Sequence, residues 1–133
     1  PIVSPVGYEG GSKSLFARFA GRTTGNRKPW GELFFNGDFG TALSDNDEFV
    51  EVLEAVRRAP SAINVQPWRI LKDVDGVFHF YSAGKTDMNR IDMGIALCHF
   101  EIASKEKGFT GTYQVREKGS EGEFKYLVSW VRK

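Results

Sequence analysis

The chain has 133 residues, of which 41% are hydrophobic and 26% charged, a balance typical of a globular domain and not of a disordered segment. Its 18 basic and 17 acidic residues give a formal net charge of +1, which argues against a dedicated binder of nucleic acid. No apolar run approaches the roughly 20 residues that cross a bilayer. The single cysteine excludes an internal disulfide and indicates a reducing compartment, so we expect a cytoplasmic protein without a membrane partner.

The first forty residues show no sustained periodicity, because glycines interrupt every short apolar run. The stretch from Arg22 to Pro29 carries three positive charges, and we expect it to be an exposed connector. An aromatic cluster follows the connector, and glycines at 31, 37 and 40 argue against one regular element there. The cluster consists of Trp30, Leu33, Phe34, Phe35 and Phe39.

The first predicted helix begins at Ser44 and ends before Pro60. Ser44 is a favourable N-cap, and Asp47 three residues later forms a weak capping box. One apolar stripe runs along this helix at positions i, i+3, i+4 and i+7, formed by Phe49, Val52, Leu53 and Val56.

Two strands are predicted next, at residues 68–71 and 77–81. Asp75-Gly76 between them is a dipeptide that tight hairpin turns prefer, so the two strands should pair as a hairpin.

A second helix is predicted from Asn89 to Lys107, and Gly108 ends it. Residues 91–100 are apolar nearly all round the helix, so we expect it to be buried on most faces, within a core or under a partner. Two strands follow, at 113–117 and 124–131. The second strand alternates, with Phe124, Tyr126, Val128 and Trp130 on one face.

The chain does not carry the complete form of the common catalytic motifs. Gly84-Lys85-Thr86 resembles the end of a P-loop, but His79 stands where that motif requires its first glycine. His79 and His99 have no partner at metal-ligand spacing, so we interpret both as structural. Cys98 and His99 are adjacent on a helix and point about 100° apart, so they do not form a nucleophile–base pair.

The segment from Ala59 to Trp68 carries the most informative polar residues. Pro60 and Pro67 fix its backbone at both ends. One hydroxyl and two carboxamides lie between the prolines, at Ser61, Asn64 and Gln66, and they could serve a heteroaromatic ligand. The alternative is a capped turn in which Ser61 and Asn64 satisfy their own backbone.

Two blocks of the sequence resemble FMN-dependent nitroreductases. The first is Arg58-Ala59-Pro60-Ser61-Ala62-x-Asn64-x-Gln66-Pro67-Trp68-Arg69. The second is Ile91-Asp92-Met93-Gly94-Ile95-Ala96, followed by Glu101-Ile102-Ala103 and Lys107-Gly108-Phe109. The interval between the blocks also fits, and together they span about residues 43–112.

The resemblance implies an α+β fold, with an antiparallel or mixed sheet packed around a buried central helix in a dimer-like arrangement. It also implies FMN as cofactor and NAD(P)H as electron donor. In that family the proline–serine–asparagine loop contacts the flavin ring. The cofactor-binding residues carried over to this chain are Pro60, Ser61, Ala62, Asn64 and Gln66.

The chain departs from the family in two respects. Nitroreductases usually hold the FMN phosphate with arginines of an opening R-R-S-x-R-x-F helix. The corresponding stretch here, residues 32–39, has no arginine and two acids, so it would repel a phosphate. In addition, Pro5-Val6-Gly7-Tyr8 resembles a strand end that normally follows the central helix.

A tandem arrangement accounts for that order of motifs. Arg27-Lys28-Pro29-Trp30 and the residues after it resemble a divergent group of nitroreductases in which two halves are joined in one chain. We therefore expect residues 1–30 to be the tail of an upstream half plus a connector, and residues 31–133 to be the second half. The partner would be that upstream half or a second copy of this chain.

The sequence leaves two functions open. The first is an FMN-dependent oxidoreductase that reduces nitroaromatic, quinone or similar small-molecule acceptors and needs no acid–base pair of its own. The second is a non-catalytic protein of the same fold that binds another ligand or serves as an interaction module, which the missing arginines favour.

Overall fold

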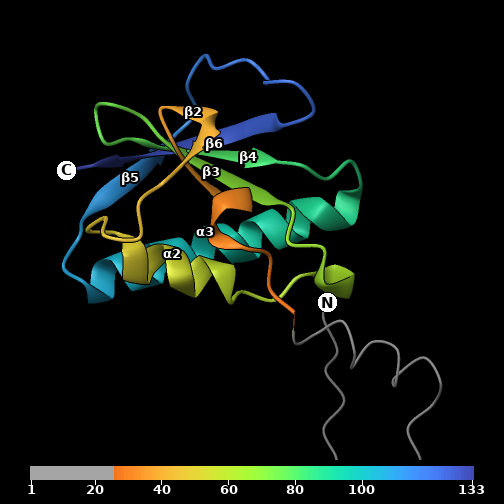
Figure 1. The fold of residues 1–133 in the computed structure, drawn as a ribbon, viewed down its shortest axis with the longest axis horizontal. Coiled ribbons are helices and arrows are strands. Elements are labelled where there is room, and N and C mark those ends of the chain that lie inside the picture. Colours follow the sequence, from red (N-terminus) through yellow and green to blue (C-terminus); the bar gives the residue numbers. More distant parts are fainter. Residues whose placement is uncertain (1–25) are drawn as a thin grey trace, which may run out of the picture.

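The computed structural model describes residues 26–133, which form an α+β unit (Figure 1). The predicted upstream tail at Pro5–Tyr8 and the first part of the connector lie outside the described residues, so the boundary at residue 30 stays a prediction. In chain order the elements are η1 (Trp30–Glu32), β1 (Phe34–Asn36), β2 (Asp38–Ala42), α2 (Val50–Arg57), η2 (Ala62–Asn64), β3 (Trp68–Lys72), β4 (Phe78–Ser82), α3 (Asp87–Glu106), β5 (Gly111–Gln114) and β6 (Lys125–Arg132), where η denotes a 3₁₀ turn.

The six strands form one sheet in the order β2-β1-β3-β4-β6-β5. β1 runs parallel to β3, and every other pair of neighbours is antiparallel, which confirms the mixed sheet. β3 and β4 form the predicted hairpin, with Ile70 opposite Phe80. Gly76 adopts φ +76° in its turn, a conformation that glycine reaches without steric cost.

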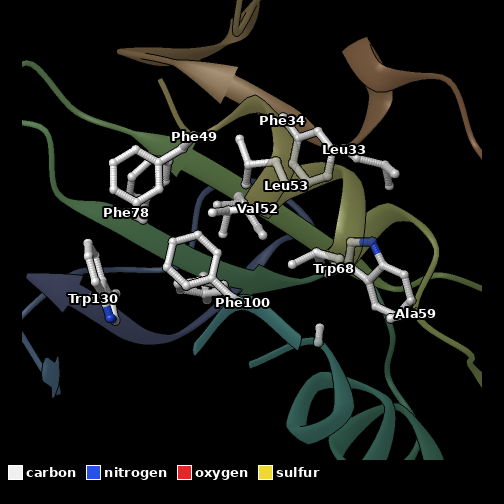
Figure 2. Close-up of a cluster of buried hydrophobic side chains, with 14 of the residues drawn as sticks. Leu33, Phe34, Phe49, Val52, Leu53, Ala59, Trp68, Phe78, Phe100 and Trp130 are labelled. Atoms are coloured by element: carbon white, nitrogen blue, oxygen red, sulfur yellow. The ribbon is translucent and has the colours of Figure 1, made fainter. Parts of the chain in front are cut away.

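Both helices cover the same face of the sheet (Figure 1). The core between the two layers is strongly aromatic, and Phe49, Phe78, Phe100 and Trp130 point toward one another in it (Figure 2). The Phe49 and Phe78 ring centroids lie 4.7 Å apart, and those of Phe100 and Trp130 lie 5.3 Å apart. Such aromatic pairs contribute roughly 0.5–1.5 kcal/mol each beyond their burial, so these rings stabilise the contact between the helices and the sheet.

Helix α2 begins later than predicted. Val50 is its first residue, not a residue next to Ser44. Residues 44–49 form turns instead, in which Ser44 Oγ accepts the Asn46 amide and Asp47 Oδ1 accepts the Phe49 amide. The predicted stripe of Phe49, Val52, Leu53 and Val56 is nevertheless buried, as its spacing requires.

Helix α3 matches its predicted range within two residues, and Gly108 follows it with φ +79°. The expectation that it is buried on most faces is wrong for the described chain. Met93, Ala96 and Phe100 are buried against the sheet, whereas Ile91 and Ile102 are 61% and 54% exposed. The helix lies on the sheet instead of at the centre of it, so only one face finds a partner within residues 26–133.

The ends of the sheet differ from the predicted strands. The aromatic cluster at 30–39 forms the turn η1 and the short pair β1–β2, in which Trp30 Nε1 donates to the Leu43 carbonyl at 2.7 Å. β5 begins at Gly111, two residues before its predicted start, and ends at Gln114. In β6 an irregular register inserts Leu127 between the partners of Phe80 and Tyr81. The predicted one-sided alternation is therefore wrong, because Tyr126 packs with Tyr81 and Trp130 packs in the opposite core.

Candidate functional site

Residues 60–67, here called the signature loop, connect α2 to β3. Ser61 Oγ accepts the Gln66 amide at 2.9 Å, and the Ser61 carbonyl accepts the Asn64 amide at 3.0 Å. The Pro67 carbonyl accepts the Ala83 amide at 2.8 Å, which joins the end of the loop to β4. The loop is thus a turn closed by its own hydrogen bonds and attached to the end of β4.

The signature loop has a strained backbone. Ile63, Asn64 and Gln66 have φ values of 46°, 57° and 48°, in the left-handed region that residues other than glycine rarely adopt. Ile63 is β-branched, for which this conformation is an outlier, and its side chain is 87% exposed, so no packing compensates it. Strain of this kind concentrates at functional sites and requires support from the surroundings.

Segment 26–28 supplies part of that support. Gln66 is only 2% exposed; its Oε1 accepts the Lys28 amide at 2.8 Å, and its Nε2 donates to the Asn26 carbonyl at 3.3 Å. Asn64 Nδ2 donates to the same Asn26 carbonyl at 2.6 Å. The capped-turn interpretation therefore holds for Ser61, which binds the loop backbone, whereas the Asn64 carboxamide binds this distant segment.

Arg27 contacts both the signature loop and the end of α2. Its guanidinium donates to Asn64 Oδ1 at 2.7 Å and to the Arg58 carbonyl at 3.0 Å. Arg27 and Lys28 are half-buried, so the expectation of an exposed connector is wrong for these two residues. The sequence shows their charge but no pattern that would place them beside a loop more than thirty residues away.

Asp92 of α3 supports the loop from the other side. Its Oδ1 accepts the Ala62 amide at 2.8 Å, and the residue is 2% exposed. Its Oδ2 is buried and has no hydrogen-bond partner among residues 26–133, an exception that calls for an explanation in a native protein. Asp92 belongs to the second block of the resemblance, but nothing in the sequence alone indicated that it contacts the first.

A cleft of about 650 Å³ opens where segment 26–28 meets the signature loop. This volume lies within the range of small-molecule sites. The cleft is lined by Asn26, Arg27, Lys28, Pro29, Glu32, Ile63, Asn64, Val65 and Gln66.

The basic side chains around the cleft differ in their pairing. A hydrogen bond from Arg57 lowers the pKa of the Glu54 carboxyl, and Glu54 binds both Arg57 and Arg58 at distances of 2.6–2.8 Å. Lys28 lies 3.6 Å from Glu32, where solvent weakens the interaction. Arg27 and Lys28 are therefore the cations that the cleft itself presents.

Residues 32–39 do not form the arginine-bearing helix of the family pattern. They complete η1 and form β1 and the first part of β2, and Glu32 lies at the cleft. This stretch therefore brings a negative charge to the cleft, as the sequence predicts. The positive charges at the cleft come from segment 26–28 instead.

The remaining candidates do not line the cleft. His79 is fully buried, with Nδ1 2.7 Å from Ser129 Oγ and Nε2 2.8 Å from Asp73 Oδ2, which confirms its structural interpretation. Cys98 is exposed on α3. Thr86 caps α3 through Asn89 and belongs to no phosphate loop. Within residues 26–133, no group of three or more acidic, histidine or cysteine side chains could hold a metal ion.

The family comparison covers the first block and most of the second. The family model described as "Putative TM nitroreductase" matches residues 10–104, which include the signature loop and most of α3. The chain belongs to this nitroreductase family. No curated protein and no solved structure matched the chain. Among residues 26–133, no helix combines the length and the apolar character that a membrane span needs.

Proposed function

We propose that the chain is the second half of an FMN-dependent NAD(P)H oxidoreductase that reduces nitroaromatic, quinone or similar acceptors. The observation that carries the proposal is the cleft at the signature loop, where polar loop residues and two cations meet within a member of the nitroreductase family. A flavin mononucleotide needs a polar contact for its ring and positive charge for its phosphate.

The donor set of the cleft fits this cofactor. Asn64, which lines the cleft, would lie against the ring, with Ser61 and Ala62 beside it in the loop and Pro60 shaping the backbone. Lys28 would face the phosphate in place of the missing arginines, since a charged ammonium group binds phosphate well, and Arg27, whose guanidinium binds Asn64 and the Arg58 carbonyl, would add positive charge beside it. Gln66 is buried and would act through the loop.

FMN, when bound, supplies hydride transfer between NAD(P)H and the acceptor. The protein then needs to bind and orient the ring and leave one face open, without an acid–base pair of its own. This requirement agrees with the structural role of His79, which is fully buried between Ser129 and Asp73.

Cofactor retention tests the proposal. The protein containing both halves should be yellow, should release FMN on denaturation and should oxidise NAD(P)H in the presence of a quinone. Substituting Ser61→Ala and Asn64→Ala together should weaken FMN binding at least about tenfold, the loss of roughly 1.4 kcal/mol. The matched control, Asn46→Ala with Ser120→Ala, removes the same groups from exposed positions. A colourless protein that retains no added FMN would exclude this function.

A second function is favoured by one specific observation. The carboxamides of Asn64 and Gln66 already bind segment 26–28 through four hydrogen bonds and each other through a fifth, so the loop is satisfied without a ligand. A non-catalytic member of the family, serving as a binding or interaction module, would have this property. FMN titration separates the two functions, because this alternative predicts no retention.

The outer face of α3 supports the proposed partner. Met88, Ile91 and Ile102 are each more than half exposed there, and a monomer rarely leaves several large apolar side chains along one helix. We propose that a second nitroreductase-like half covers this face, either the upstream half or a second copy. Ile91→Glu with Ile102→Glu should then dissociate two copies in sedimentation experiments or, where the partner is the upstream half of the same chain, speed hydrogen–deuterium exchange of α3. Wild-type chain that stays monomeric with α3 accessible would contradict the proposal.

A further inference from the structure

The signature loop is held partly by its own hydrogen bonds and partly by segment 26–28. The loop needs support because three of its residues hold left-handed backbone conformations without glycine. Its internal hydrogen bonds, such as that from the Gln66 amide to Ser61 Oγ, close the turn. Within the loop the Asn64 side chain accepts a hydrogen bond from Gln66 Nε2, and its contacts with Asn26 and Arg27 come from outside the loop.

Arg27 joins the two ends of this region. One guanidinium nitrogen donates to Asn64 Oδ1 inside the loop, and the other donates to the carbonyl of Arg58, just after α2. A planar guanidinium can bridge two acceptors in fixed positions, whereas a lysine ammonium cannot reproduce that fork. The bridge therefore fixes the strained part of the loop against the end of a rigid helix.

We propose that Arg27 is a positioning residue that holds the signature loop in its strained, ligand-binding conformation. In the bridged state the loop amides keep their acceptors and the cleft keeps its shape. Without the bridge, the strain at Ile63 and Asn64 favours opening of the loop. Only the effect on ligand binding rests on the proposed function.

Hydrogen–deuterium exchange of the loop tests the inference without any ligand. The amides of Ala62, Asn64, Val65 and Gln66 all have acceptors, so peptides covering 61–66 should be protected in the wild type. Arg27→Ala should speed their exchange roughly tenfold or more, because hydrogen bonds from charged groups are strong. The matched control is Arg116→Ala, which removes an exposed arginine side chain far along the sequence.

The same experiment gives two results that would overturn the proposal. Unchanged exchange of 61–66 in Arg27→Ala would show that the loop holds itself. An equal increase in β4 peptides would show that Arg27 supports the whole fold instead of the loop. Arg27→Lys separates geometry from charge: we expect exchange close to that of Arg27→Ala. Full protection in Arg27→Lys would contradict the bridging role.

A second substitution tests whether Arg27 is needed because the loop backbone is strained. Glycine adopts the φ of Ile63 freely, so Ile63→Gly in the Arg27→Ala background should restore much of the loop protection. In FMN titration, Arg27→Ala should bind at least about tenfold more weakly and the double variant should recover part of that loss. If wild-type protein binds no FMN, the proposed function fails, while the exchange data still decide whether Arg27 positions the loop. No rescue by Ile63→Gly would reject strain as the reason for the bridge.

Discussion

Strand β3 is flanked by two connections of opposite construction. The hairpin turn at residues 73–77 is stabilised locally: Asp73 Oδ1 accepts the amides of Asp75 and Val77, and the left-handed position is given to Gly76. The signature loop on the other side gives such positions to Ile63, Asn64 and Gln66, and draws its support from residues 26–28 and 92. The hairpin turn is optimised for stability, whereas the loop keeps strain that stability alone would remove.

The largest expected effect comes from removing the local cap of the hairpin. Asp73→Ala eliminates two hydrogen bonds to backbone amides and one to the buried His79. We expect the free energy of unfolding to fall by about 3 kcal/mol in urea denaturation, since each lost bond leaves a polar group without its partner. Asp75→Ala is the control, because that side chain is exposed. Equal losses in both variants would show that the turn does not depend on its cap.

The next effect concerns the glycine of the hairpin. Gly76→Val forces a β-branched residue into φ +76° and should lower the free energy of unfolding by about 2 kcal/mol. Gly119→Val is the control, since a side chain there meets open space. A Gly76 variant as stable as the Gly119 variant would remove the conformational contrast between the two connections.

Introducing a glycine at a left-handed position should stabilise the signature loop. Ile63→Gly relieves left-handed strain at an exposed residue and should raise the free energy of unfolding by about 1 kcal/mol, after the entropy cost of glycine. Val65→Gly should instead lower stability, because Val65 has an ordinary φ of −71°. Thermal unfolding of the two variants, compared directly, would refute the strain argument if both were equally destabilised.

A smaller effect concerns how the free energy of unfolding depends on pH through His79, which contacts the hairpin turn at Asp73. Burial lowers the pKa of His79, against the raising effect of Asp73, and Lys118 and Arg116 lower it further. The unfolded chain therefore binds a proton first, and stability should fall as pH drops below about 6.5, by less than about 1.4 kcal/mol per pH unit. His79→Gln should flatten this slope in pH-dependent urea denaturation. His99→Gln is the control, and an equal flattening there would exclude His79 as the cause.

The local patterns predicted the parts of the fold that local residues determine. The stripe on α2 is buried as its spacing predicts, Asp75-Gly76 forms the hairpin, and Gly108 follows the end of α3. The early start of α2 was wrong because Ser44 and Asp47 cap turns with the same side-chain oxygens that cap helices.

The roles of Asp92 and Arg27 depend on tertiary contacts that the sequence did not indicate. The role of Asp92 depends on α3 passing under the signature loop, and that of Arg27 on a contact across 37 positions of the chain. No periodicity encodes either. The resemblance located the loop itself, but it attributed the carboxamides of Asn64 and Gln66 to a ligand without showing that segment 26–28 binds them.

The parallel pairing of β1 with β3 bears on the order of folding events. β3 and β4 are joined by a short turn and can pair within microseconds, whereas β1 reaches β3 only after the chain has passed through α2 and the signature loop. We therefore expect hairpin substitutions to slow folding, and loop substitutions to act mainly on the unfolding rate, in stopped-flow measurements. Comparable φ-values in both places would contradict this order. The loop would then acquire its strained shape late, once a framework exists that can resist it.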